Sequence, residues 1–357
     1  MINKRVAKAE AILHDHGLAA MIFTDLNNIR YLSGFTGTDG VLILTKDSLS
    51  FLTDSRYTTQ AREQTECRVI EYKDKLDGIS DFLANQPDKG RIGFEGSILT
   101  FQVYSSLLEK AGPEFEFVPV QDTASLRAVK DRDEIGKMRS AADISARALD
   151  SILGLLQPGI TESEVALELE IAARRLGSER KAFDFIVASG VRGALPHGVA
   201  SSKRIDRGDV VTIDFGSCFE GYYSDETVNF AIGTISTEMQ KIHNIVKKAH
   251  DLAIKSIKPG VLLSDIDKIA RDFISEKGYG VNFGHGLGHG VGLDVHESPR
   301  VSPLATMRAE EGMVFTVEPG IYIPDLGGIR IEDMVVVTAA GCDCLTRLPK
   351  ELRLLTN

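Results

Sequence analysis

Two segments of this chain, far apart along the sequence, repeat the same pattern of residues, and this repetition constrains the fold more than any other feature. Residues 207–216 match residues 311–320 in most of their glycine and apolar positions, and an acid stands at equivalent places in both, Asp214 and Glu318. In each copy an apolar run leads to the acid, as in a buried strand. The chain is therefore expected to contain a duplicated unit.

The repeat extends to both sides of these segments. Downstream, each is followed by a glycine-containing turn and a second acidic segment, residues 223–227 in one copy and 329–333 in the other. Upstream, residues 158–164 resemble residues 259–265, and both lead into amphipathic segments that end at a glycine, a residue that commonly terminates helices. We expect two halves, each a helix with strands in hairpins, related by a pseudo-twofold axis.

The length of the chain indicates a second domain beside the repeat. Single cores usually stop growing at roughly 250–300 residues, and this chain has 357. Helical and strand patterns alternate from residue 4 to residue 119, as in an α/β domain, with a turn-rich connection expected at residues 27–37. A long helix is predicted at residues 131–156. We therefore predict an α/β domain at residues 1–121 and an α+β domain at residues 122–357.

Three of the eight histidines, His285, His289 and His296, lie in a glycine-rich segment, residues 283–296. The i, i+4 spacing of the first two would suit a metal-binding helix. However, glycine stands at every second position from 284 to 292, and each glycine costs a helix about 1 kcal/mol. The glutamate that follows the first histidine of a zinc-peptidase helix is also missing. We expect a loop or a broken strand here.

The acids of the repeat predict a metal centre. Asp214 and Glu318 have Asp225 and Glu332 as their partners in the second acidic segments. Any one of them alone would be better explained as a solvated carboxylate at a strand edge. Four buried carboxylates would repel one another and lose hydration, and two divalent cations would neutralise them. This favours a dinuclear site with one added histidine and ions roughly 3.5–4 Å apart. Mostly oxygen ligands favour Mn²⁺, with Co²⁺, Fe²⁺ and Zn²⁺ as alternatives.

The order of these residues resembles that of a known family. Asp214, Asp225, His289, Glu318 and Glu332 follow one another, with Gly-His-Gly-Leu-Gly-His at 284–289, Val-Glu-Pro-Gly-Ile-Tyr at 317–322 and Gly-Ile-Arg-Ile-Glu-Asp at 328–333. The set is similar to that of the metallopeptidases that include prolidase, aminopeptidase P and methionine aminopeptidase. Residues 28–35 resemble the creatinase-like N-terminal domain of the first two. The resemblance covers nearly the whole chain and implies the pita-bread fold, a duplicated α+β unit.

The resemblance implies a role for each residue of the metal centre. The implied ligands are Asp214, Glu318 and Glu332, which bridge or chelate two ions, Asp225, which binds one ion, and His289, the lone imidazole. Glu318 is also expected to move a proton to the leaving nitrogen. Two bound cations would lower the pKa of a shared water toward neutrality and so supply the nucleophile.

Further residues are assigned around the metal centre. By resemblance, His197 and His296 match substrate-binding and transition-state histidines, and His285 matches a histidine that lines the pocket. Arg330 precedes Glu332 by two residues, so both side chains share one face of a strand, where Arg330 can hold a ligand carboxylate. Tyr322 has two equally supported interpretations. It could take part in the site, or it could be an ordinary aromatic side chain of a strand. No role is assigned to His14, His16, His243 and His250.

The resemblance implies a metal-dependent hydrolase that cuts the peptide bond between an N-terminal residue and proline. An Xaa-Pro dipeptidase (prolidase) is the first expectation, and aminopeptidase P, which takes longer Xaa-Pro peptides, is the alternative. A creatinase-like hydrolase or a non-catalytic peptide-binding protein would not need the metal ligands, and all five are present. Methionine aminopeptidase would not need residues 1–120. The chain departs from the family after Asp225, where a threonine-arginine run is common but residues 226–229 lack the arginine.

Composition excludes several other classes of function. The net charge of −10, without a run of Lys or Arg, disfavours nucleic-acid and anionic-membrane partners. No apolar run approaches the ~18 residues of a transmembrane helix, and the N-terminus has no signal-peptide core. The four cysteines, at 67, 218, 342 and 344, lack metal-finger spacing and are expected to be thiols of a cytoplasmic protein. A homodimer is expected from the resemblance alone.

Overall fold

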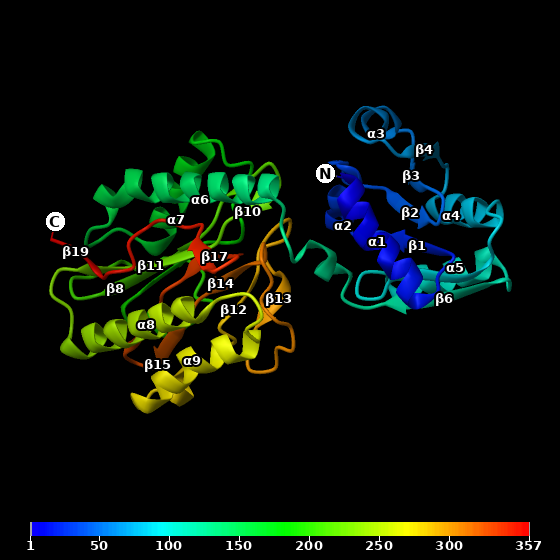
Figure 1. Cartoon of the computed structure of the whole chain (residues 1–357). Coiled ribbons are helices and arrows are strands. Elements are labelled where there is room, and N and C mark those ends of the chain that lie inside the picture. The colour runs from blue at the N-terminus through cyan, green and yellow to red at the C-terminus, as the bar shows by residue number, and fades with distance from the viewer. Residues whose placement is uncertain (1, 357) are drawn as a thin grey trace. The chain divides into compact units, whose positions relative to one another are not determined.

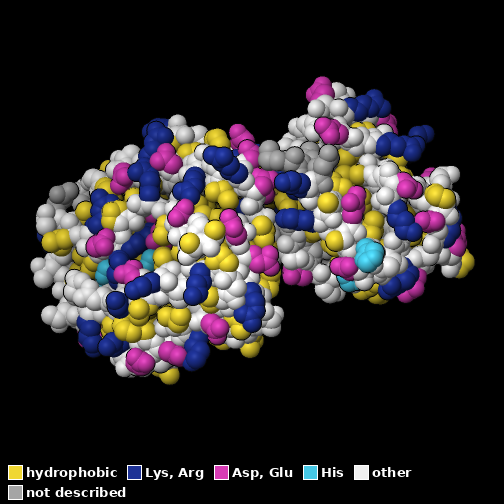
Figure 2. All heavy atoms as spheres, in the orientation of Figure 1, with side chains coloured by type: hydrophobic (Ala, Val, Ile, Leu, Met, Phe, Trp, Pro, Cys, Tyr) yellow, Lys and Arg dark blue, Asp and Glu magenta, His cyan; other side chains and the backbone are white. Residues whose placement is uncertain are grey.

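The computed structural model of the chain describes residues 2–356 and divides into two compact units, with the division between Arg127 and Ala128 (Figure 1). The boundary predicted from the sequence, between residues 121 and 122, precedes the 3₁₀ helix η1 (Thr123–Arg127). None of the helices in the described part of the chain has the length and hydropathy that a membrane span requires. On the face shown in Figure 2, basic and acidic side chains are interspersed on each unit.

The N-terminal unit is a mixed six-stranded sheet with helices. Its elements are α1 (Ile2–His16), β1 (Ala20–Phe23), α2 (Leu26–Ser33), β2 (Val41–Thr45), β3 (Leu49–Thr53), α3 (Thr58–Gln64), β4 (Arg68–Glu71), α4 (Lys75–Ala84), β5 (Gly90–Glu95), α5 (Phe101–Ala111) and β6 (Phe115–Val120). The strand order is β4-β3-β2-β1-β5-β6, with antiparallel pairing at β3-β2 and β2-β1 and parallel pairing at the other joints. Helices α4 and α5 pack on the sheet through Leu83 and Leu107. The predicted α/β class is confirmed.

One prediction in this unit is wrong. Residues 27–37, expected to be a turn-rich connection, lie largely in helix α2. The Asp25 carboxylate caps the start of this helix by accepting a hydrogen bond from the Asn27 amide, and Gly34 ends it at a φ of 83°. Ile29 is fully buried on the helix. The polar residues Asn27, Asn28 and Ser33, which suggested turns, lie within this short helix, and Gly34 is its C-cap.

The first half of the C-terminal unit places two helices against three antiparallel strands. Its elements are α6 (Arg132–Ile152), η2 (Leu153–Leu155), α7 (Glu162–Arg175), β7 (Ile186–Ser189), η3 (Gly190–Ala194), β8 (Val210–Phe215), β9 (Cys218–Phe219), β10 (Tyr222–Tyr223) and β11 (Glu226–Ile232). Strands β7, β8 and β11 are neighbours in that order. Leu149 of α6 and Leu169 of α7 pack with Val211 and Phe230 in one core cluster. The long helix predicted at residues 131–156 is thus present as α6 followed by η2.

The second half repeats this arrangement. Its elements are α8 (Thr237–Ser256), α9 (Leu263–Glu276), η4 (Gly280–Asn282), β12 (Gly288–Gly290), β13 (Glu297–Val301), β14 (Val314–Val317), β15 (Gly320–Ile323), β16 (Gly327–Arg330), β17 (Asp333–Thr338), β18 (Gly341–Cys344) and β19 (Arg353–Leu355). The order β12-β14-β17 corresponds to β7-β8-β11, and both sets are antiparallel. Val246 of α8 and Ile266 of α9 pack with Phe315 and Val335. Figure 1 shows the strands between the helix pairs α6/α7 and α8/α9. The predicted duplicated α+β domain is confirmed.

The ends of the helices follow from the sequence. Helix α6 begins with a capping box formed by Asp131 and Glu134, and α7 begins in the same way with Thr161 and Glu164. Such boxes satisfy amide groups that the first turn leaves unpaired. Past the ends of α7 and α9, Gly177 and Gly278 have φ angles of 104° and 89°, which only glycine adopts readily. Glycines at equivalent positions thus end the equivalent helices of the two halves.

The two half-sheets meet at a short seam. An antiparallel bridge joins Thr227 of β11 to Glu332, which precedes β17. At that bridge the Glu332 amide donates to the Thr227 carbonyl at 3.3 Å. After the second half-sheet, the chain returns to the first. Its last strand, β19, pairs in parallel with β11. The seam therefore lies beside two of the predicted metal ligands, Asp225 and Glu332.

Candidate metal centre

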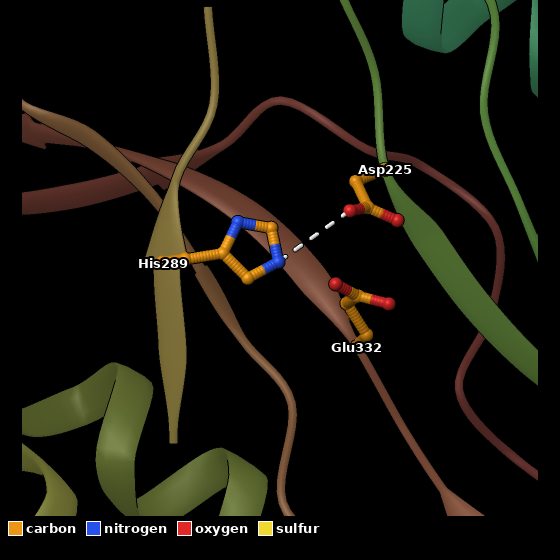
Figure 3. Close-up of side chains that lie close together, drawn as sticks. All are labelled: Asp225, His289 and Glu332. Atoms are coloured by element: carbon orange, nitrogen blue, oxygen red, sulfur yellow. Dashed lines mark ion pairs between the residues drawn. The ribbon is translucent and has the colours of Figure 1, made fainter. Parts of the chain in front are cut away.

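Residues from three separate segments meet at the seam. One ligand atom from each of Asp225, His289 and Glu332 lies within 4.8 Å of the other two. Figure 3 shows the three side chains pointing toward one another, and they come from the residue before β11, from β12, and from the residue before β17. Asp225 and Glu332 are buried, whereas His289 is partly exposed. The structure thus brings together ligands from both halves of the repeat.

The other two predicted ligands border this group. Glu318 lies just after β14, and its Oε1 atom is 3.3 Å from His289 Nε2. Asp214, on β8, is directly opposite Thr227 in the β8-β11 register. Its Oδ2 atom accepts a hydrogen bond from Arg330, whereas its Oδ1 atom is buried and has no hydrogen-bond partner among the described residues. An unpartnered buried carboxylate oxygen is costly, and a cation would satisfy it.

The tautomer of His289 suits a metal ligand. Its Nδ1 atom lies 3.1 Å from the Gly290 carbonyl oxygen, which can only accept, so Nδ1 carries the proton. The Nε2 lone pair then faces two carboxylates, at 3.7 Å from Asp225 Oδ2 and 3.3 Å from Glu318 Oε1. Burial lowers the pKa of His289, which favours the neutral ring. A lone pair facing carboxylate oxygens is repulsive unless a cation lies between them.

The carboxylates are electrostatically strained as a group. Burial raises the pKa of Asp225 well above its ordinary value, and Glu332, Asp214 and Glu318 raise it further. Burial likewise raises the pKa of Glu332 far above normal, with Glu318 and Asp214 adding to the effect. The pKa of Glu318 is raised by burial too, although His285 and Arg330 oppose that rise. The raised pKa values favour protonated carboxylates in this cluster, and divalent ions would replace the protons.

Arg330 connects the cluster to two further residues. Its guanidinium donates to Asp214 Oδ2 at 2.6 Å and to the hydroxyl oxygen of Tyr322 at 3.0 Å. The Tyr322 hydroxyl lies 3.0 Å from His285 Nε2, and His285 Nδ1 lies 2.7 Å from the Gly286 carbonyl. Because that carbonyl fixes the proton on Nδ1, the hydroxyl donates to Nε2. Tyr322 thus hydrogen-bonds to two of the predicted site residues, Arg330 and His285.

The remaining predicted histidines lie at the exposed side of the site. The rings of His296 and His289 are 4.2 Å apart between centroids. Burial lowers the pKa of His296, and His289 and His197 act in the same direction. His197 is exposed in the loop after η3, where Arg330 also donates to the Pro196 carbonyl at 3.0 Å. The site thus runs from a buried floor of carboxylates to an edge of solvent-exposed imidazoles.

Two threonines that the sequence analysis overlooked support the carboxylates. Thr227 Oγ1 donates to Glu332 Oε2 at 2.6 Å. Thr316 Oγ1 donates to Glu318 Oε1 at 3.1 Å and accepts from the His289 amide at 3.0 Å. Thr227 follows Asp225 by two residues and Thr316 precedes Glu318 by two. Strand alternation therefore places each threonine on the same face as a predicted ligand, and this signal was available in the sequence.

The glycine-rich segment is held from outside the site. It contains only the short strand β12, as the glycine content predicted. Arg271 of α9 donates to the carbonyl oxygens of Phe283 and His285, at 2.9 and 2.7 Å. Asp267, buried on the same helix, accepts from the Leu287 amide at 3.0 Å and pairs with Arg271. A segment rich in glycine thereby acquires a fixed conformation.

Comparisons with known proteins agree with this geometry. The model of metallopeptidase family M24 matches residues 136–339, and that of the creatinase/prolidase N-terminal domain matches residues 5–129. An Xaa-Pro dipeptidase of Pyrococcus furiosus is 37% identical over 353 residues, covering 98% of this chain and 100% of the relative.

Solved structures give the same result. An Xaa-Pro dipeptidase from Bacillus anthracis has a TM-score of 0.96 and 39% identity, covering 99% of this chain and 100% of that one. An X-Pro aminopeptidase from Thermotoga maritima has a TM-score of 0.87 and 40% identity, covering 95% of this chain and 98% of that one. The family match spans more than half of the chain, and the full-length relatives extend it over nearly all of it. The resemblance in the sequence is confirmed, and the chain belongs to metallopeptidase family M24.

Proposed function

We propose that this protein is a dinuclear metal-dependent peptidase that hydrolyses the bond between an N-terminal residue and a following proline, with Xaa-Pro dipeptides as its substrates. The observation that carries the proposal is the meeting of Asp225, His289 and Glu332 from both halves of the fold, bordered by Glu318 and Asp214. The residues fit a pair of divalent cations, because the buried carboxylates outnumber the arginine that contacts them and Asp214 Oδ1 has no hydrogen-bond partner within residues 2–356.

Each residue has a defined task in this proposal. The five ligands would hold two divalent cations, which would supply a hydroxide nucleophile at neutral pH and polarise the scissile carbonyl. Glu318, with its raised pKa, takes a proton and delivers it to the leaving nitrogen. His296 and His197, at the exposed edge, orient the substrate and stabilise the developing negative charge. His285 and Tyr322 position Arg330, which fixes the orientation of Asp214.

The ion we favour is Mn²⁺. Four carboxylates and one imidazole form an oxygen-rich set, which suits a hard ion better than thiolate-containing sites do. Co²⁺, Fe²⁺ and Zn²⁺ are the alternatives.

Metal-dependent activity is tested by dialysis against a chelator, followed by assay of an Xaa-Pro dipeptide. We expect activity to be lost and then restored by Mn²⁺ or Co²⁺, and full turnover by the metal-free protein would contradict the proposal.

Aminopeptidase P activity on longer peptides is the second candidate. The relatives include both an Xaa-Pro dipeptidase and an X-Pro aminopeptidase at similar identity, 39% and 40%. An Xaa-Pro dipeptide and an Xaa-Pro-Yaa-Zaa tetrapeptide separate the two. Cleavage of the dipeptide alone supports the dipeptidase, whereas good turnover of the tetrapeptide supports aminopeptidase P.

Three broader assignments belong to the same proposal. We assign catalysis to residues 122–357 and a creatinase-like domain to residues 1–121. We propose a homodimer, by analogy with the family, and a monomeric mass in light scattering would contradict it. We also propose a cytoplasmic location, for which the support is that the four cysteines are free thiols, as is usual in a reducing compartment.

A further inference from the structure

A second group of buried charges lies behind the metal centre. Each of the two ligands at the seam is followed by another acid, Glu226 after Asp225 and Asp333 after Glu332. Consecutive residues of a strand point to opposite faces. Glu226 and Asp333 are accordingly buried away from His289, at 0% and 6% exposure.

Lys350 forms ion pairs with both of these acids. Its Nζ atom lies 2.5 Å from Glu226 Oε1 and 3.1 Å from Asp333 Oδ1, and its side chain is 6% exposed. His250 of α8 completes the group at 3.2 Å from Asp333 Oδ2. Glu226 belongs to the first half of the repeat and Asp333 to the second, so one ammonium group links the two halves.

The segment that carries Lys350 makes the same link with other atoms. Thr346 Oγ1 donates to Asp333 Oδ1 at 2.5 Å, and the Leu348 amide donates to Glu226 Oε1 at 3.0 Å. This segment joins β18 of the second half-sheet to β19, which pairs with β11 of the first. Figure 1 shows the red C-terminal chain running from the region of β17 toward β19.

On the side of the metal centre, the seam is joined by a backbone bridge and by Arg330 of the second half, which donates to Asp214 and Thr227 of the first. Its backbone bridge is the pair Thr227 and Glu332, supported by the hydrogen bond from Thr227 Oγ1 to Glu332 Oε2. Asp225 stands on one side of the seam, and His289 and Glu332 stand on the other. The separation of the ligands therefore depends on how the halves are joined.

We infer that Lys350 is a positioning residue of the metal centre: by pairing with Glu226 and Asp333 across the seam, it sets the spacing between Asp225 and Glu332. The inference rests on the proposed function, since it assigns Lys350 a task in metal binding.

The test compares the metal affinity of variants of the full chain. Lys350→Met removes the ammonium with little change in shape, and Glu226→Gln is a milder change that keeps the amide contact from Leu348. Glu162→Gln is the matched control, because Glu162 is fully buried and accepts from the Ser189 and Ser201 amides. Ser189 pairs with Val211, at the other end of β8 from Asp214. Far-UV circular dichroism checks that each variant is folded.

Calorimetric titration of the chelated proteins with Mn²⁺ gives the first readout. We expect the Lys350 and Glu226 variants to bind Mn²⁺ about tenfold more weakly or worse, as is typical when residues that hold ligands are changed. The Glu162 variant should bind like the wild type. Equal affinity in all four proteins would overturn the inference. So would an equal loss in the Glu162 variant, because the effect would then be one of general stability.

Hydrogen exchange of the metal-free proteins gives a readout independent of metal binding. The Glu332 amide donates across the seam, so it should exchange faster in Lys350→Met while residues 210–215 of β8 keep their protection. Uniformly faster exchange through the C-terminal unit would contradict a specific role. Failure of the wild type to bind Mn²⁺ would count against the proposed function instead, and the exchange measurement would still decide whether Lys350 holds the seam.

Discussion

At the scale of single residues, small hydroxyl side chains hold the proposed ligands in place. Thr227 donates to Glu332 and also accepts from Arg330 Nε at 3.3 Å. Thr316 supports Glu318 in the other half-sheet. Carboxylates that bind metals commonly depend on such contacts for their orientation. Substitution of either threonine should therefore weaken metal binding, although no ligand is removed.

Thr227→Val tests this dependence. The substitution keeps the shape of the side chain but leaves Glu332 without its hydroxyl donor, so we expect Mn²⁺ affinity to fall by about 10- to 100-fold. Thr212→Val is the matched control, because the Thr212 hydroxyl is buried in the same sheet and donates to Asn229. Calorimetry should find near-normal affinity in the control. Unchanged affinity in Thr227→Val would show that the hydroxyl has no such task.

Glu318→Gln tests the proposed proton carrier. The amide cannot take a proton from the nucleophile, so we expect turnover of an Xaa-Pro dipeptide to fall by roughly 10²-fold or more. Glu311→Gln changes an exposed glutamate of the same repeat segment and should leave turnover unchanged. Substantial activity in the Glu318 variant, assayed with saturating Mn²⁺, would remove Glu318 from the mechanism.

At the scale of elements, the glycines of β12 allow the backbone of this strand to approach β14 closely. A Cβ atom on Gly288 would overlap the backbone carbonyl of Thr316. The neighbouring His289 is therefore placed by a strand that admits no side chain at that point. By contrast, a Cβ atom on Gly284, in the same segment, would lie in open space.

Gly288→Ala and Gly284→Ala form a matched pair. The first must displace the backbone, so we expect a loss of about 1–3 kcal/mol in the free energy of unfolding together with weaker Mn²⁺ binding. The second should stay within about 0.5 kcal/mol of the wild type. Urea denaturation measures both. Similar stability in the two variants would show that the close approach is not required.

The parts of the fold that occur twice could be predicted from the sequence. The duplication, its helices and the four acids were accessible, because matching segments carry that information, whereas His289 was assigned by the family resemblance. Helix α2 was missed because it is short and contains polar residues that are also common in turns. The cluster around Lys350 was also missed, since Glu226, Asp333 and Lys350 come together only through the return of β19 to the first half-sheet. Contacts made by an irregular segment leave no periodic signal.

At the scale of the whole molecule, stability should depend on both pH and metal. The pKa values of Asp225 and Glu332 are raised in the folded chain, first by burial and then by neighbouring carboxylates. A raised folded-state pKa stabilises the fold below the ordinary pKa, near 4, and that contribution is lost as the pH rises through the raised value. Bound cations remove the penalty by neutralising the charges.

Thermal unfolding in chelator, measured from about pH 5 to about pH 8, tests this linkage. We expect the midpoint of the wild type to fall relative to that of Asp225→Asn as the pH rises, because the variant carries one fewer buried charge. Mn²⁺ should stabilise the wild type most at the upper end of the range. Parallel profiles for the two proteins would show that the carboxylates are not coupled in this way.

We propose that five side chains from the two duplicated halves hold a pair of divalent ions. Crystals soaked in Mn²⁺ and measured at the manganese absorption edge test it most directly. We expect two anomalous peaks, roughly 3.5–4 Å apart, among Asp214, Asp225, His289, Glu318 and Glu332. A single peak, or peaks away from these residues, would contradict it.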